Sequence, residues 1–400
     1  MTKDTTVCIV GLGYIGLMTA AAYLEVGLCV IGIESDEAQT RRIACGEMAL
    51  PAWARRTLME ATISDRFNVN SGKADEADCF LVCVPPSSSD PVSLNGALYF
   101  VAENLRRGHV IILQSTLHPG TTRAWAERLG RATGLLAGTD FYLAHSPERI
   151  NPGDKEHTIK NTPRLVGGLT PDCQRFAMLY LSRICDNLVP VSTPEIAELA
   201  KLLENTYRLV NIALVNEIAE LARLGGVDIY DVVEAAATKP FGYAPFSPGT
   251  GAGGQCIPVV PRYLAQWAIR LGHNTPIINA ALAFNDALPE RIAEQIAECE
   301  AGAVLIVGIA FKPGQSDYRN SQAVKVISAL RRHGIRADFY DPYVAVINGE
   351  GINLNLVSDN WYDVAAVMVN HPSLPWNEIA RVSRSMLDFC GAMHKVQTGE

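Results

Sequence analysis

The feature that most limits the fold of this chain is a glycine-rich segment near its start, Gly11-Leu12-Gly13-Tyr14-Ile15-Gly16. It follows an apolar run at residues 6–10, which we predict to be a buried strand, and it opens an Ala- and Leu-rich helix over residues 17–26. A second apolar strand at residues 28–33 is followed by Glu34. This order predicts a βαβ unit in a parallel sheet that is covered on both faces.

The same unit predicts a dinucleotide site, because a glycine turn between a strand and a helix brings backbone N–H groups to phosphates. Gly11 would permit the tight turn, Gly13 the approach of a pyrophosphate, and Gly16 the close packing of helix on strand. A carboxylate at Glu34 would accept hydrogen bonds from ribose hydroxyls and repel a 2′-phosphate, which favours NAD over NADP. The expected cofactor contacts in this unit are Gly11, Gly13, Tyr14, Ile15, Gly16 and Glu34.

The predicted secondary-structure pattern changes twice in the rest of the chain. From Pro194 to about residue 224 the pattern predicts one long helix, with Thr193 as its N-cap. More helices follow around an irregular segment at 239–261, and a second α/β pattern begins at residue 303. We therefore predict an α/β protein with domains at residues 1–193, 194–296 and 297–400.

Composition excludes several classes of protein. The net charge is −8 and no run of Lys or Arg occurs, so we expect no nucleic-acid partner. No apolar stretch approaches the ~20 residues of a membrane span, and the polar start does not resemble a signal peptide. The ten cysteines include no CxxC pair, so we expect no metal site and reduced thiols in a cytoplasmic protein.

One cysteine stands apart from the others. Cys256 ends the Gly- and Pro-rich segment, in which the main chain can approach a ligand closely, so it is a candidate nucleophile. The alternative is an inert loop thiol. A thiolate suits the oxidation of an alcohol to an acid, because it can add to an aldehyde and then carry a thioester. Lys201 and Asn205 share one helix face, and Glu148 follows a strand end, so these polar groups could assist.

At these residues the chain closely resembles the UDP-glucose/GDP-mannose 6-dehydrogenase family, over about residues 7–388. The matching motifs are the glycine turn, 114–122 (QSTLHPGTT), 146–149 (SPER), 152–153, 166–168, the helix motifs at 198–201, 204–205, 211–214 and 216–217, the Cys256 loop, and Phe311, Lys312, Asp317, Arg319 and Ser321.

The resemblance implies two Rossmann-like domains with parallel sheets, joined by a long central helix that dimerises and by a helical middle domain carrying the cysteine loop. It implies an N-terminal NAD-binding domain, a C-terminal UDP-sugar-binding domain, and a homodimer or higher homo-oligomer. It also implies oxidation of the C6 alcohol of a UDP-sugar to the uronic acid, with reduction of two NAD. The segment 235–242 (AAATKPFG) is similar to the branch that acts on UDP-N-acetylhexosamines, which makes such a sugar the first choice over UDP-glucose.

The resemblance also implies roles for individual residues. Cys256 would be the nucleophile, Lys201 and Asn205 would hold the reacting oxygen and a water, Glu148 would act in hydrolysis, and Thr116 would lie near the cofactor and that water. Further cofactor contacts would be Val84, Pro85, Ser115 and Thr116. Substrate contacts would be Glu148, Arg149, Lys201, Asn205, Phe246, Gly249, Gly253, Lys312 and Arg319.

The chain departs from the family pattern beside the nucleophile. Val260 stands where relatives have an Asp four residues after the cysteine, and valine can neither accept a proton nor hold a water. Gln255 replaces a common His, and the segment 84–87 (VPPS) differs from the usual Val-Pro-Thr-Pro turn. Losing one general base typically costs ~10²–10⁴-fold in rate. We therefore expect a dehydrogenase with an atypical rate or substrate.

Two other functions fit part of the pattern. One is a simple 2-hydroxyacid or 3-hydroxyacyl dehydrogenase, which would need neither Cys256 nor a second α/β domain. The other is a degenerate or single-oxidation relative that binds NAD and a nucleotide-sugar.

Overall fold

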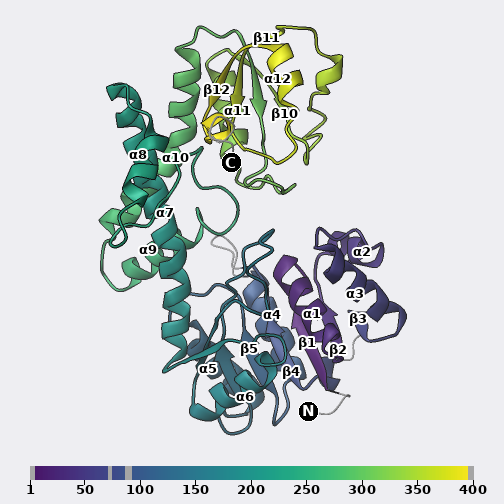
Figure 1. Ribbon diagram of the computed structural model, residues 1–400. Helices are drawn as coiled ribbons and strands as arrows, with labels where there is room; N and C mark the ends of the chain where they lie inside the picture. Colours follow the sequence, from purple (N-terminus) through teal and green to yellow (C-terminus); the bar gives the residue numbers. More distant parts are fainter. Residues whose placement is uncertain (1–4, 71–73, 86–91, 395–400) are drawn as a thin grey trace. The chain divides into compact units, whose positions relative to one another are not determined.

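The computed structural model describes residues 5–70, 74–85 and 92–394. The chain divides into two compact units, Met1–Leu202 and Leu203–Glu400. Within each unit a sheet carries helices on both faces (Figure 1). This confirms the predicted α/β class. The three-domain division proposed from the sequence stays a prediction.

The first unit is built on one sheet of eight strands in the order β3-β2-β1-β4-β5-β6-β7-β8. The strands are β1 (Thr6–Val10), β2 (Cys29–Ile33), β3 (Phe67–Val69), β4 (Cys79–Val82), β5 (Val110–Leu113), β6 (Tyr142–His145), β7 (Arg164–Gly168) and β8 (Leu188–Val191). Neighbouring strands are parallel except β6 and β7, which pair antiparallel. No helix connects β6 to β7, and a strand reached without a crossover helix can return antiparallel to its neighbour.

Helices bury both faces of this sheet, which explains why its strands are continuously apolar. They are α1 (Tyr14–Glu25), α2 (Glu37–Ala44), α3 (Ala52–Ile63), the 3₁₀ turn η1 (Ala74–Glu76), α4 (Val92–Asn104), α5 (Thr121–Thr133) and α6 (Pro171–Leu181). Residues of α1, α3 and α6 form the core on one face, and residues of α4 and α5 form it on the other.

Helix α7 (Pro194–Gly225) begins in the first unit and ends in the second, as one continuous helix over the predicted range. The second unit continues with α8 (Ile229–Ala237), α9 (Val260–Arg270), α10 (Pro276–Ala297), β9 (Ala303–Val307), α11 (Gln322–Arg332), β10 (Arg336–Tyr340), η2 (Leu354–Leu356), β11 (Tyr362–Val367), α12 (Trp376–Val382) and β12 (Ser383–Asp388). Its four strands are all parallel, in the order β10-β9-β11-β12. Helices α10 and α11 cover one face of the sheet and α12 the other.

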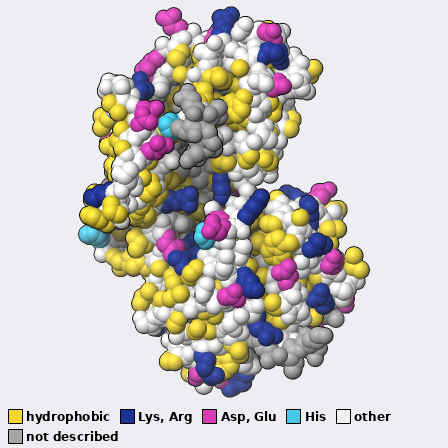
Figure 2. Space-filling view, viewed as in Figure 1, with side chains coloured by type: hydrophobic (Ala, Val, Ile, Leu, Met, Phe, Trp, Pro, Cys, Tyr) yellow, Lys and Arg dark blue, Asp and Glu magenta, His cyan; other side chains and the backbone are white. Residues whose placement is uncertain are grey.

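On the face drawn in Figure 2, basic and acidic side chains are interspersed over each unit. Among the described helices, none is both long and apolar enough to cross a membrane.

Candidate functional site

The glycine turn lies where the strand order reverses, because β1 has β2 on one side and β4 on the other. Ligands of doubly wound sheets bind at such a switch point. Gly11 has φ 93°, and a Cβ there would lie 2.9 Å from the backbone nitrogen of Val84. A Cβ on Gly16 would lie 1.9 Å from the carbonyl oxygen of Gly11, whereas one on Gly13 would meet no atom within 4 Å. The turn is therefore closed at its base and open at Gly13, which fits a pyrophosphate at the start of α1.

Replacing Gly16 with alanine is expected to destabilise the first unit by about 1–3 kcal/mol and to abolish tight NAD binding, because the methyl group would overlap the Gly11 carbonyl. Gly96, inside α4, is the matched control, since a Cβ there meets nothing within 4 Å and alanine favours a helix. Urea unfolding and NAD titration of G16A and G96A test this. Equal stability and affinity in both variants would contradict the packing argument.

Glu34 lies directly beside the turn. Its Oε2 accepts a hydrogen bond from the backbone N–H of Leu12 at 2.9 Å, and its Oε1 accepts one from Asp36 at 2.9 Å. The side chain of Asn70 binds both backbone polar groups of Glu34. The carboxylate is thus held next to the phosphate-facing N–H groups, where a dinucleotide ribose is read in this type of fold.

The other proposed cofactor residues follow the ends of β4 and β5. The buried hydroxyl of Ser115 donates to the carbonyl of Val84 at 2.6 Å and so holds the backbone at Val84. Thr116 is half-buried and Pro85 is exposed. Pro86 and Ser87 lie outside the described residues.

Glu148 is nearly buried and is firmly held. Its Oε1 accepts hydrogen bonds from the backbone N–H groups of Arg149 and Ile150, both at 2.8 Å, and its Oε2 accepts one from the buried guanidinium of Arg164. Arg149 itself donates to the carbonyl of Pro163 at 2.8 Å, which closes the base of the same loop. The sequence reasoning missed Arg164, because nothing in its surroundings marks it as a partner of Glu148.

Tyr14 connects this loop to the glycine turn. Burial raises the pKa of Tyr14, while a hydrogen bond to the backbone of Gly153 lowers it and the charge of Glu148 raises it further. The structure therefore brings Tyr14 and Glu148, two of the predicted site residues, into one neighbourhood in the first unit.

Helix α7 is fastened to the same unit by Glu198, one turn before Lys201. The fully buried carboxylate of Glu198 accepts hydrogen bonds from the backbone N–H of Gly120 (2.6 Å) and from the N–H and hydroxyl of Thr122 (2.8 and 2.6 Å). Burial raises the pKa of Glu198 in spite of these bonds. The start of α5 has no side-chain cap of its own, so Glu198 supplies one from another helix. Lys201 is half-buried.

His145 ends β6 and is completely buried, which lowers its pKa from 6.5 to about 3. Since the folded pKa lies below the unfolded one, the stability contributed by uncharged His145 is complete above about pH 6.5 and is lost as the pH falls towards 3. The free energy of unfolding should fall by roughly 2 kcal/mol between about pH 6.5 and about pH 5 on this account. Urea unfolding of the parent and of H145Q at both pH values checks it. An equal loss in both proteins would show that other groups cause the pH dependence.

In the second unit, Cys256 is exposed at the end of its loop. Its thiol interacts electrostatically with Arg319, whose guanidinium is paired with Asp317 at 2.6 Å. Hydrogen bonding to Asp317 raises the pKa of Arg319, and the charge of the Cys256 thiolate raises it further. Arg319 was predicted as a substrate contact, and the structure places it in the electrostatic neighbourhood of Cys256.

Buried amides hold the loop that leads to Cys256. Asn285 accepts from the N–H of Ala252 at 2.7 Å and donates to its carbonyl at 3.2 Å, and Gln322 donates to the same carbonyl at 2.8 Å. Asn216 accepts from the N–H of Gly249 at 2.9 Å. Because backbone groups in a glycine-rich loop lack a regular ladder, these side chains replace it. Sequence reasoning missed Asn285 and Gln322.

The structure also shows the surroundings of the other second-unit residues that the sequence analysis singled out. The ring of Phe246 contacts that of Tyr207 edge-on, with centroids 5.9 Å apart. Asn205 is buried on α7, and its Nδ2 has no partner among the described residues. Lys312 is half-buried. Val260 is 3% exposed and begins α9, and its N–H donates to the carbonyl of Cys256 at 2.9 Å.

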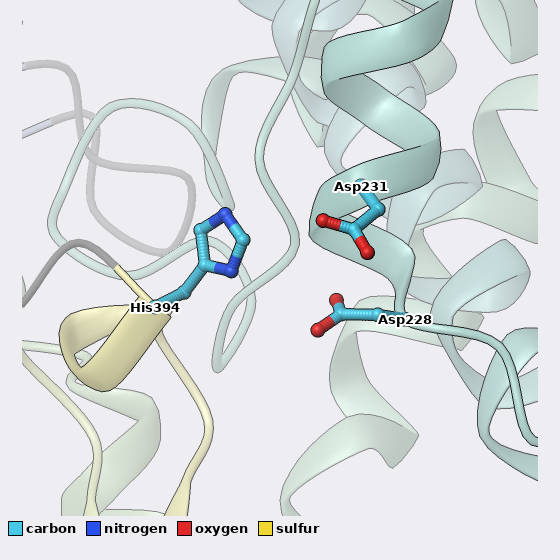
Figure 3. Close-up of side chains that lie close together, drawn as sticks. All are labelled: Asp228, Asp231 and His394. Carbon is cyan, nitrogen blue, oxygen red and sulfur yellow. The ribbon is translucent and has the colours of Figure 1, made fainter. Parts of the chain in front are cut away.

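The described residues contain one group with the spacing of metal ligands, although the sequence predicted no metal. Ligand atoms of Asp228, Asp231 and His394 lie within 4.8 Å of one another, and Figure 3 shows the three side chains turned towards a common space. Each of the three side chains either makes a contact within the protein or is exposed to solvent. Asp228 caps α8 by accepting from Tyr230 at 2.8 Å, His394 lies 3.2 Å from Glu234, and both aspartates are exposed.

A doubly wound sheet with a glycine turn at its switch point and an acid after its second strand defines a protein of the dinucleotide-binding α/β class. Residues 5–184, 195–287 and 305–389 match, respectively, the NAD binding, central and UDP binding domains of the UDP-glucose/GDP-mannose dehydrogenase family. The chain belongs to this family. The resemblance predicted from the motifs is confirmed, and so is NAD as the cofactor.

Individual relatives are similar along most of their length. A UDP-N-acetyl-D-mannosamine dehydrogenase of Pyrococcus horikoshii is 32% identical over 96% of this chain and 94% of its own. A UDP-N-acetyl-D-glucosamine 6-dehydrogenase of Pseudomonas aeruginosa is 32% identical over 86% of this chain and 84% of its own. A solved structure of the UDP-D-ManNAc dehydrogenase from Pyrococcus horikoshii superposes with a TM-score of 0.88 at 30% identity, covering 97% of this chain and 96% of that one.

Proposed function

We propose that this chain oxidises the C6 alcohol of a UDP-N-acetylhexosamine to the uronic acid, with NAD as the hydride acceptor. The observation that carries the proposal is the exposed Cys256 at the end of a clamped glycine-rich loop, beside the guanidinium of Arg319. Relatives named for UDP-N-acetyl-D-mannosamine and UDP-N-acetyl-D-glucosamine support the choice of sugar over UDP-glucose.

The cofactor would be held by the turn Gly11–Gly16, with Glu34 on its ribose and Val84, Pro85, Ser115 and Thr116 near its nicotinamide. When bound, NAD supplies the acceptor for hydride. The chain's own residues then divide the remaining work. Lys201 and Asn205 would hold the reacting oxygen, and Thr116 would lie beside the water that enters later.

Cys256 would carry the covalent chemistry. Its thiolate adds to the carbonyl carbon of the aldehyde made in the first oxidation, and the resulting oxyanion takes a proton to give a thiohemiacetal. Loss of hydride and of that proton leaves a thioester. Water then adds to the thioester carbon, the carbon–sulfur bond breaks, and the thiol and carboxylate are released. Glu148, fixed by Arg164, would orient that water.

The substrate would be recognised mainly by the second unit. Phe246, Gly249 and Gly253 of the loop, with Lys312 and Arg319, would contact the nucleotide-sugar, and Glu148 and Arg149 would contribute from the first unit. We keep the division into domains at residues 1–193, 194–296 and 297–400 as part of this proposal.

A homodimer or higher homo-oligomer formed through α7 is also proposed. Leu203, Tyr207 and Leu214 share one face of the helix, and each exposes more than half of its surface. Sedimentation equilibrium tests this, and a monomer at every concentration would rule it out.

We further propose a cytoplasmic location, since all ten cysteines are free and such thiols persist in a reducing compartment.

The decisive experiment counts NADH per sugar over a panel of UDP-sugars. Two NADH per sugar with a carboxylate product support the proposal. One NADH with an aldehyde product would instead favour a single oxidation, the alternative that Val260 raises. Binding of NAD and UDP-sugar without any NADH would identify a degenerate relative.

A further inference from the structure

The two sheets repeat one local arrangement. In the first unit, Gly11 has φ 93° and its N–H donates to the carbonyl of Ile33 at 2.8 Å. In the second unit, Gly308 has φ 84° and its N–H donates to the carbonyl of Tyr340 at 2.8 Å. Each glycine follows the first strand of a βαβ unit, and each carbonyl ends the next strand. The turn after β9 is therefore the counterpart of the dinucleotide turn after β1.

The acid that follows the second strand has a different environment in the two units. Glu34 is half-buried, and one N–H of its turn, that of Leu12, donates to it. Its counterpart Asp341 has a completely buried side chain. Oδ2 of Asp341 accepts from the N–H groups of Ile309 (2.7 Å) and Ala310 (3.0 Å), and Oδ1 accepts from those of Tyr343 (2.8 Å) and Val344 (3.0 Å). An acid so enclosed cannot bind a ribose, so it holds the turn instead.

His371 completes this arrangement and is also completely buried. Its Nδ1 accepts a hydrogen bond from the N–H of Gly314 at 3.1 Å, so the ring hydrogen lies on Nε2, which donates to Oδ2 of Asp341 at 3.0 Å. Asp341 thus binds the start of the segment 309–314, and His371 binds its end. The two side chains therefore hydrogen-bond to both ends of the segment that carries Phe311 and Lys312.

The same segment touches the cysteine loop. A Cβ on Gly254 would lie 3.0 Å from the ring of Phe311, and one on Gly253 would lie 3.1 Å from the Cβ of Phe311. The N–H of Phe311 donates to the carbonyl of Asp317 at 2.9 Å. Phe311 is therefore packed against the backbone two and three residues before Cys256, and a shift of the turn would move that backbone.

We propose that Asp341 and His371 are positioning residues that set the turn at 309–314 and, through it, the placement of Lys312 and of the Cys256 loop. The inference rests on the proposed function for the roles of Lys312 and Cys256. It adds to that function a buried Asp–His pair in the second unit. Where Glu34 of the first unit is expected to bind a ribose, Asp341 and His371 bind the backbone of the turn instead.

The test uses variants of His371 in the full chain. H371L removes both hydrogen bonds, H371Q retains an amide that can donate to Asp341, and H333L is the control. His333 lies in the same unit, but its partner Glu290 is at the surface, 2.7 Å away.

Two quantities are measured on each folded protein, namely the affinity for UDP alone by calorimetry and the rate of iodoacetamide alkylation at Cys256 by peptide mass spectrometry. The exposed thiols Cys45 and Cys299 report general changes in reactivity.

We expect H371L to weaken UDP binding by about tenfold, because a displaced turn would cost one hydrogen bond between Lys312 and the charged nucleotide. We also expect its Cys256 alkylation rate to change while the rates at Cys45 and Cys299 do not. H371Q should lie close to the parent, and H333L should equal it. If H371L does not fold, D341N keeps the side-chain size and carries the same comparison. Parental UDP affinity and parental Cys256 reactivity in a folded H371L or D341N would overturn the proposal.

Neither measurement requires turnover, so the two proposals fail separately. A chain that binds UDP and shows the expected responses but forms no NADH from any UDP-sugar contradicts the proposed function alone. Where the parent is active, the variants should also raise KM for the UDP-sugar more than they lower kcat.

Discussion

Replacing Cys256 with serine is expected to lower steady-state formation of NADH and of the carboxylate by about 10³-fold or more, because a serine hydroxyl is a far poorer nucleophile than a thiolate. In the proposed mechanism the thiol acts only after the first oxidation, so a single turnover to the aldehyde should survive. Stopped-flow absorbance of NADH combined with product analysis separates the two stages.

The control for this variant is C299S, because Cys299 is an exposed thiol of the same unit that has no proposed role. It should retain parental activity. Undiminished NADH production by folded C256S would mean that the chain follows the chemistry of a simple hydroxy-acid dehydrogenase, in which no covalent intermediate forms.

Replacing Val260 with aspartate is expected to raise the rate with UDP-N-acetylhexosamines by ~10²–10⁴-fold, the usual contribution of one well-placed general base. The backbone at position 260 is hydrogen-bonded to the carbonyl of Cys256, so the carboxylate would enter one helical turn from the thiol. The site is only 3% exposed, so burial of an aspartate should cost about 1–3 kcal/mol in stability.

V260N is the matched control, since asparagine has the size of aspartate but cannot accept a proton at neutral pH. A gain in V260D that is absent in V260N shows that Val260 slows a standard mechanism. Equal rates in V260D, V260N and the parent would show instead that the chain acts on a different substrate or by different chemistry.

Much of the fold could be predicted from the sequence because its elements have strong local patterns. The helix from Pro194, the strand at residues 6–10 and the helix near residues 322–333 were all found where apolar period and capping residues place them. The three-residue strand Phe67–Val69 was missed, because so short a segment has no readable period. Strand Arg164–Gly168 and its antiparallel pairing were missed as well, since pairing direction depends on the path of the preceding loop.

The candidate site was likewise predictable only in part. That Gly11, Gly16 and Glu34 lie at one turn could be predicted, because these residues belong to a single local βαβ pattern, while their roles in binding stay predictions. Arg164 could not, because its contact with Glu148 crosses an irregular loop, and Glu198 could not, because its partner Thr122 is 76 residues away.

For Cys256, the sequence by itself determined that one thiol of ten stands in a glycine-rich loop and that Val260 lacks the carboxylate of its relatives. Only the tertiary structure decided which buried polar groups hold that loop. Asn285, Gln322 and Phe311 reach it from α10, from α11 and from the turn after β9. The reason is physical. A hydrogen bond between residues 33 or 70 positions apart depends on how a whole sheet packs against its helices, and no local sequence pattern records that packing.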